Sequence, residues 1–281
     1  MRCQAALPDD TRRIRAYWSR VDANTQVALS GVIPALALMW LFDHLDRKRP
    51  EPASTRRLVA FVGMLSVIPA IFLERYLMSG VGASLAPEYT YQGASFKAFV
   101  VAAGVEEACK IGVVYWIVWR RPEFDERMDG IVYATRAGLG FALVENVMYL
   151  LQSQSLQGQL YMWVARAFLA VPGHAMWTGM IGYMAARRRF DKTGLGLIGG
   201  YLLAVAFHGA YDCAVFVQQP LHFEGYATAS RLMLLIPIGL TVIAFFVLRS
   251  MARTALRLDD AEAARHAVAA AQATQPPASA V

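Results

Sequence analysis

The chain has 281 residues, of which 57% are hydrophobic and 17% charged, and its mean hydropathy is +0.37. This apolar share exceeds that of a soluble domain. Because the charged residues cluster between apolar runs, the composition indicates an all-α, polytopic transmembrane helical bundle of about seven spans in the lipid bilayer. The net charge of +6 does not indicate a nucleic-acid partner, since the basic residues flank predicted spans. The three cysteines give neither a disulfide framework nor a CxxC metal site.

The pattern of charge divides the chain into three regions. Residues 1–26 contain five arginines and no apolar run, so they form a polar N-terminal segment without a cleavable signal peptide. Residues 27–250 form the predicted transmembrane domain. Residues 251–281 are an Ala-rich tail, which we expect to be helical at first and disordered after Thr274.

Seven apolar runs follow one another between residues 27 and 248, and each predicts a membrane span. Basic clusters follow the odd-numbered spans, which places the C-terminus in the cytoplasm. Seven spans then place the N-terminus outside, and its five arginines conflict with that orientation. The predicted spans are 27–42, 58–78, 96–119, 131–151, 160–185, 195–217 and 232–248.

The third span contains two adjacent carboxylates and a lysine, which are Glu106, Glu107 and Lys110. Ionisable side chains are costly to bury in hydrocarbon, and within a span they usually mark a functional site that faces protein or water. The alternative is a structural ion pair between Glu106 and Lys110, four residues apart on one helix face. That pairing would leave Glu107 without a partner.

Polar side chains also occur within the fourth, fifth and sixth spans. A structural alternative exists for each: an interhelical clasp for Glu145 with Asn146, a kink after Pro172 for His174, and a packing pair for His208 with Asp212. The residues in question are Glu145, Asn146, Tyr149, His174, His208 and Asp212.

Four of these side chains come from four different spans yet fall at similar depth. At ~1.5 Å per residue from the outer span ends, Glu106, Glu145, His174 and His208 lie between ~9 and ~20 Å deep. Such a layer predicts a metal site or a proton path. Histidine and glutamate are ligands of Zn²⁺, and a metal with an open position activates water for hydrolysis while a nearby carboxylate takes the proton. No HExxH motif and no serine nucleophile elbow is present.

Five motifs in order resemble those of the PrsW family of intramembrane metalloproteases, which is related to the CAAX-processing and bacteriocin-immunity membrane proteases. The resemblance covers about residues 30–250. The motifs are EExxK at 106–110, FDExxDGIVY at 124–133, GFxxxENxxYL at 140–150, RAxLxxxxHA at 166–175 and HGxYD at 208–212.

The resemblance implies a metallopeptidase of the bacterial cytoplasmic membrane that cleaves a membrane-anchored protein such as an anti-sigma factor. It implies that Glu106, Glu107 and His208 are catalytic. We expect Glu145, His174 and His208 to bind a divalent metal, Zn²⁺ by their chemistry, and either Glu106 or Glu107 to be the general base. The expected supporting residues are Lys110, Asn146, Tyr149 and Asp212.

Two other functions use the same polar layer. A proton-coupled carrier would use it as a relay, although such proteins commonly show internal repeats and matching broken helices, and this sequence shows neither. A non-catalytic scaffold or immunity-type protein would bind partner helices and would tolerate Glu107→Gln without loss of function.

Overall fold

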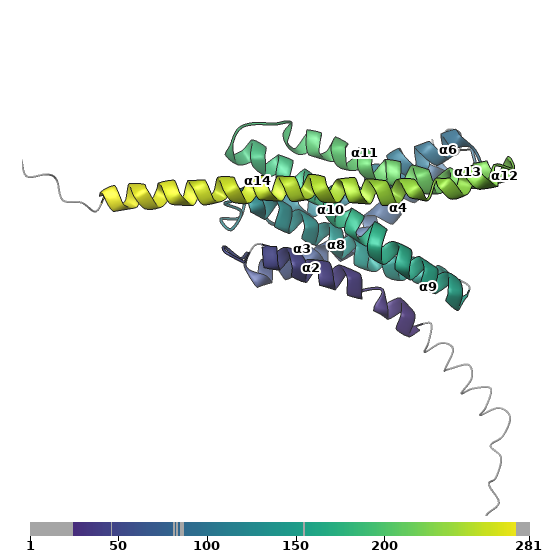
Figure 1. Cartoon of the computed structure of the whole chain (residues 1–281), viewed down its shortest axis with the longest axis horizontal. Coiled ribbons are helices and arrows are strands. Elements are labelled where there is room, and N and C mark those ends of the chain that lie inside the picture. Colours follow the sequence, from purple (N-terminus) through teal and green to yellow (C-terminus); the bar gives the residue numbers. More distant parts are fainter. Residues whose placement is uncertain are drawn as a thin grey trace, which may run out of the picture.

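A computed structural model describes residues 25–45, 47–80, 82, 84, 87–153 and 155–273. Within these ranges the regular structure is helical and contains no strand, which confirms the predicted all-α bundle (Figure 1). The first 24 residues of the predicted polar segment, and the chain end where disorder was expected, lie outside the described residues.

Three helices of 13 residues each lie between residues 33 and 79. They are α2 (Ile33–Leu45), α3 (Ala53–Leu65) and α4 (Val67–Ser79). The second predicted span is bent between α3 and α4 at Ser66, whose hydroxyl donates to the Gly63 carbonyl at 2.7 Å. Pro69 lies in the first turn of α4, where its missing N–H leaves no helical hydrogen bond unmade.

Two helices of the bundle contain π-helical stretches. The third predicted span begins as α6 (Tyr91–Phe96), continues as the π-helix η1 (Lys97–Gly104) and ends as α7 (Val105–Ile117). The fifth is composed in the same way of α9 (Leu156–Ala165), η2 (Arg166–Ala170) and α10 (Val171–Phe190). π-Helical turns are rare and occur frequently at functional sites.

The centre of the bundle is the packed pair of α8 (Arg127–Gln152) and α10. Glycines allow the two backbones to approach closely, as small residues do between membrane helices. A Cβ atom on Gly182 would lie 1.9 Å from the Gly130 carbonyl oxygen, and one on Gly138 would lie 2.6 Å from that of His174. Any larger side chain at these positions would push the helices apart.

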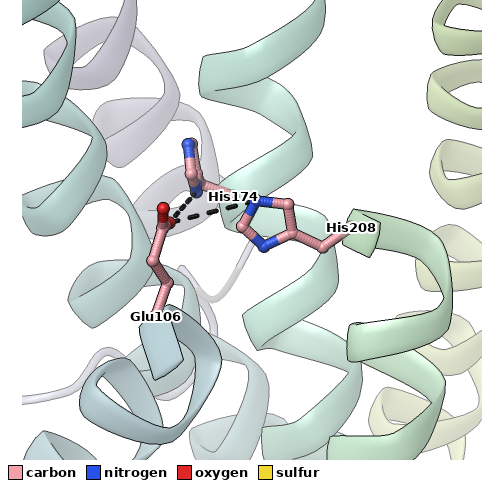
Figure 2. Close-up of side chains that lie close together, drawn as sticks. All are labelled: Glu106, His174 and His208. Atoms are coloured by element: carbon pink, nitrogen blue, oxygen red, sulfur yellow. Dashed lines mark ion pairs between the residues drawn. The ribbon is translucent and has the colours of Figure 1, made fainter. Parts of the chain in front are cut away.

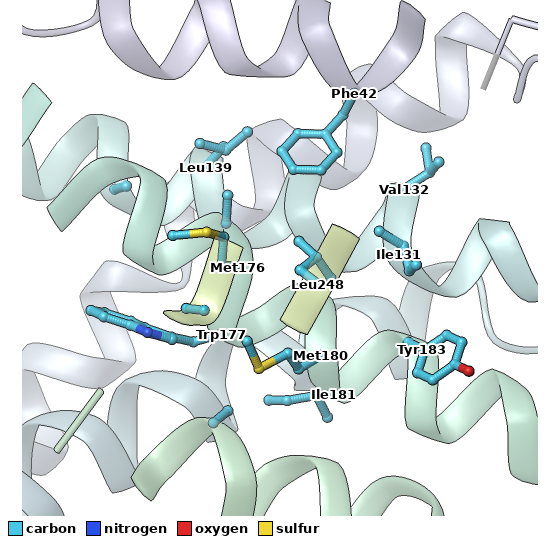
Figure 3. Close-up of a cluster of buried hydrophobic side chains, with 14 of the residues drawn as sticks. Phe42, Ile131, Val132, Leu139, Met176, Trp177, Met180, Ile181, Tyr183 and Leu248 are labelled. Atoms are coloured by element: carbon cyan, nitrogen blue, oxygen red, sulfur yellow. The ribbon is translucent and has the colours of Figure 1, made fainter. Parts of the chain in front are cut away.

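The largest group of buried apolar side chains surrounds this pair and is contributed also by α2 and by the last long helix (Figure 3). Met176, Met180 and Ile181 of α10 meet Ile131 of α8 and Leu248 in this cluster. The remaining helices are α11 (Gly196–Phe216), α12 (Gln218–Phe223), α13 (Ala227–Leu232) and α14 (Leu235–Ala273).

The number of seven spans is more than the structure supports. Four helical stretches in the described part of the chain are long and apolar enough to cross a membrane. The predicted spans 96–119, 131–151 and 160–185 are not among them. The long helices α8 and α10 of the last two segments are mostly enclosed by other helices. The four candidates are Thr25–His44, Ala53–Ser79, Gly196–Phe223 and Ala227–Ala273.

α14 continues without a break from the bundle into the Ala-rich tail and projects beyond the other helices (Figure 1). Where it leaves the bundle it is attached to the start of α8. The Asp259 carboxylate accepts from the backbone N–H groups of Arg127 and Met128, both at 3.0 Å, and pairs with the Arg127 guanidinium at 3.0 Å. A carboxylate at a helix N-terminus satisfies N–H groups that lack helical partners, so this contact fixes α14 against α8.

Candidate metal centre

Three side chains from three helices converge inside the bundle (Figure 2). Glu106 comes from α7, His174 from α10 and His208 from α11. One oxygen or nitrogen atom of each lies within 4.8 Å of the others. Glu106 Oε2 is 3.9 Å from His174 Nδ1 and 3.9 Å from His208 Nε2. All three side chains are buried, so the predicted convergence of these residues is observed.

A carboxylate holds the second nitrogen of each imidazole. Glu107 Oε1 lies 3.0 Å from His208 Nδ1, and Glu145 Oε2 lies 2.7 Å from His174 Nε2. Metal-binding histidines usually donate their other ring N–H to such a partner, which fixes the tautomer and the ring orientation. His174 Nδ1 and His208 Nε2 are therefore the nitrogens directed toward Glu106.

Glu107 is fully buried and accepts three hydrogen bonds. Besides His208, the Lys110 ammonium donates to Oε1 at 2.9 Å and the Thr178 hydroxyl donates to Oε2 at 2.8 Å. A buried carboxylate is tolerated when it is paired and hydrogen-bonded in this way. These contacts fix its orientation, and they leave it less free to bind another group than Glu106.

Lys110 contacts both glutamates. Its ammonium lies 3.0 Å from Glu106 Oε2 and 2.9 Å from Glu107 Oε1. The ion pair expected as the structural alternative thus exists, but the expectation that it leaves Glu107 unpaired is wrong, because one ammonium has three donors. The third contact of Lys110 is His174 Nδ1, at 2.7 Å. A positive charge therefore already lies against two of the three converging atoms.

A second network holds Glu145 in place. Arg166 donates to Glu145 Oε2 at 2.7 Å and to Asn146 Oδ1 at 2.8 Å. Asn146 in turn donates to the Gly31 carbonyl at 2.6 Å, which ties this network to the residues just before α2. The guanidinium lies over the Tyr149 ring, 4.2 Å from its centroid. Tyr149 therefore supports Arg166, and Arg166 orients the Glu145 carboxylate.

Asp212, an expected supporting residue, lies beside the His208 ring at the nitrogen that Glu107 does not contact. Asp212 Oδ2 lies 3.4 Å from Nε2, the nitrogen that also faces Glu106. Glu145 likewise lies on the far side of His174 and outside the converging group of three. The expected roles of both residues stay predictions.

Two contributors to the site were not identified from the sequence. Trp177 stacks on the His208 ring with centroids 4.3 Å apart and an interplanar angle of 17°, and it meets His174 edge-on. Thr178 follows it on α10 and bonds Glu107. Trp177 and Thr178 follow His174 by three and four residues, so they lie one turn further along the same helix face. This spacing is the sequence feature from which they could have been identified.

The donor set fits a divalent metal. Two imidazoles and one carboxylate are a common catalytic zinc set. Ligands ~2.1 Å from a tetrahedral zinc lie ~3.4 Å apart, so the three groups, now 3.9 Å apart in two pairs and within 4.8 Å overall, would have to draw closer around the ion. The Lys110 ammonium against Glu106 and His174 indicates that these atoms favour a cation, and the carboxylates behind both rings match the surroundings of metal-bound histidines.

Comparison with known proteins gives matches over most of the chain. Residues 51–257 match the family described as PrsW family intramembrane metalloprotease. "Protease PrsW" of Geobacillus kaustophilus is 33% identical over 68% of this chain and 80% of its own length. The proteins of the same name from Bacillus subtilis and Clostridioides difficile are 30% and 28% identical, over 65% and 68% of this chain and 79% of each relative. No solved structure matches.

Proposed function

The chain belongs to the PrsW family of intramembrane metalloproteases, and from this premise we propose that the Glu106, His174 and His208 group is the centre that cleaves a membrane-anchored protein. The observation that carries the proposal is the approach of three donor atoms from three helices to within 4.8 Å of one another inside the bundle. Family membership favours this function over a carrier or a scaffold.

In this proposal His174 and His208 would hold the metal, Zn²⁺ by the chemistry of the donors, together with the Glu106 carboxylate. When bound, such a metal would supply Lewis-acid chemistry, which lowers the pKa of a water molecule and polarises a carbonyl. Glu145 and Glu107 each hold the outer nitrogen of one imidazole, which makes the inner nitrogen available. Glu145 was expected to bind the metal itself. Its contact with His174 supports an indirect role, in which it orients this histidine.

The geometry also distinguishes the two adjacent glutamates. Glu107 is fully enclosed and saturated by His208, Lys110 and Thr178. Glu106 retains 7% exposure and faces both inner ring nitrogens. A general base must reach the proton that it removes, so we assign to Glu106, beside its place in the metal donor group, the contact with the reacting water, and to Glu107 a positioning role. Lys110 balances the charge of both carboxylates.

The basic residues support an orientation with the projecting end of α14 in the cytoplasm of a bacterium. Arg187, Arg188 and Arg189 end α10 at this side of the bundle. The substrate is then a protein of the same membrane, and an anti-sigma factor with a single span is the candidate that the family resemblance suggests. The depth of Glu106 and the two histidines implies that the cut lies in or beside the span.

The test is cleavage in proteoliposomes by the full chain, with a panel of single-span proteins that includes anti-sigma factors. We expect the wild type to cleave at least one of them, Glu106→Gln to abolish cleavage, and the exposed control Glu88→Gln to leave it unchanged. Unaltered cleavage by Glu106→Gln would contradict the proposal, provided that the product ends match those made by the wild type.

A further inference from the structure

A groove runs along the outside of the bundle between α2 and α14, and it has no part in the site described above. Its volume is about 450 Å³, within the range of small-molecule sites. α10 forms its floor and α2 and α14 form its two walls. The lining is mostly apolar and includes Leu38, Phe42, Pro172, Met176, Phe245 and Ala252. Apart from its charged residues, this lining suits hydrocarbon chains.

Two arginines line the α14 wall of the groove. Arg249 and Arg253 are four residues apart on α14, on one helix face, and lie between Phe245 and Leu256 in the lining. At ~1.5 Å per residue they lie ~21 and ~27 Å beyond Leu235, where α14 begins. Since the hydrocarbon core is ~30 Å thick, both guanidinium groups reach the headgroup level of the far leaflet, with the help of their flexible stems.

No carboxylate lines the groove, and within the described ranges neither arginine has an ion-pair partner. The nearest acidic side chain on α2, Asp43, is paired with Arg56 and Arg136. The first acidic side chains on α14, Asp259 and Asp260, are paired with basic residues of other segments. The α14 wall of the groove is therefore positively charged at these two residues, while the rest of the lining is apolar.

We propose that this groove binds one anionic phospholipid, with an acyl chain along α10 and the phosphate between Arg249 and Arg253. An apolar lining with two unpaired arginines matches an anionic amphiphile better than a substrate helix, because a transmembrane helix need not carry a negative charge. The floor residues Pro172 and Met176 flank His174 in sequence, so a bound lipid would contact the helix that carries this histidine.

The experiment uses the full chain purified in mild detergent and incubated with equal amounts of phosphatidylglycerol and phosphatidylcholine of identical acyl chains. Bound lipid per protein is counted by native mass spectrometry. We expect the wild type to retain phosphatidylglycerol preferentially, and Arg249→Gln with Arg253→Gln to reduce its retention about 30-fold, as expected for two lost juxtamembrane charges. The matched control, Arg257→Gln with Arg265→Gln, removes two exposed charges of α14 outside the groove and should retain the lipid like the wild type.

A second variant fills the groove and keeps both charges. Ala252→Phe should lower retention of both lipids while the elution volume and thermal unfolding of the protein stay those of the wild type. Equal phosphatidylglycerol retention by the wild type and the Arg249 and Arg253 double variant would overturn the proposal, as would equal losses in the control. Unchanged lipid retention by Ala252→Phe together with lost substrate binding would also overturn it, in favour of a substrate helix.

Discussion

Gly138 of α8 determines how closely His174 can approach the rest of the site. A Cβ atom at this position would lie 2.6 Å from the His174 carbonyl oxygen and 2.9 Å from the Thr178 hydroxyl, whereas ordinary contacts begin near 3.4 Å. Gly138→Ala therefore requires the backbone of α10 to move by about 0.8 Å at His174. Overpacking of this kind costs about 1–3 kcal/mol, which corresponds to a fall in Tm of ~2–10 °C.

The larger consequence is for catalysis. A displacement of ~1 Å at a reacting group can cost about 100-fold in rate, so we expect Gly138→Ala to lower kcat/KM by about 10- to 100-fold at a temperature where the variant is folded. The assay is cleavage of a reconstituted single-span substrate, beside thermal unfolding of the same preparation.

Two other glycines separate loss of stability from loss of activity. Gly130→Ala places a Cβ atom 2.4 Å from the Gly182 carbonyl oxygen, so it strains the same helix pair about two turns away from His174. We expect a comparable fall in Tm with a smaller loss of kcat/KM. Gly112→Ala meets no atom within 4 Å and should be neutral or stabilising by up to ~1 kcal/mol. Activity of Gly138→Ala within twofold of the wild type would refute the reasoning.

Three further substitutions test the polar contacts of the site. Glu107→Gln should weaken metal binding about 10- to 100-fold and regain cleavage in excess metal, because a positioning residue acts through His208; titration with Zn²⁺ measures this, and a loss that excess metal does not relieve would assign the reacting water to Glu107. Lys110→Met leaves two buried carboxylates without their cation, so Tm in EDTA should fall by the equivalent of about 3–5 kcal/mol. Added metal should then raise Tm more than it does in the wild type. An unchanged Tm would show that the Lys110 ammonium does not stabilise the two glutamates. Arg166→Lys cannot donate to Glu145 and Asn146 in the geometry of the guanidinium, and we expect a 10- to 100-fold loss of metal affinity. Wild-type affinity in this variant would exclude a role for Arg166 in orienting Glu145.

The helical fold and the convergence of the site could be predicted because both depend on coarse features. Apolar runs set the helices, and residue counts from the span ends set the depth at which Glu106, His174 and His208 meet. The contact of Lys110 with Glu106 follows from a four-residue spacing. None of these inferences requires knowledge of a side-chain rotamer.

The partner of each ring nitrogen could not be predicted for the opposite reason. Whether Glu107 or Asp212 bonds His208 Nδ1 depends on the rotation of α7 against α11, and the π-helical η1 changes that rotation just before the glutamates. Trp177 was missed because an aromatic residue in an apolar run resembles any core residue. The span count was too high because apolar runs that contain buried charges were counted like lipid-facing ones. The segments 96–119, 131–151 and 160–185 contain Glu107, Arg136 and Arg166, which are buried in protein.

The most direct test of the account is the metal content of the purified full chain, measured by mass spectrometry together with equilibrium Zn²⁺ binding. We predict about one divalent ion per chain, lost in His174→Gln and in His208→Gln and retained in the control His222→Gln, which changes a histidine of α12 outside the converging group. Full metal occupancy in either of the first two variants, with cleavage preserved, would contradict the assignment of this group as the metal centre.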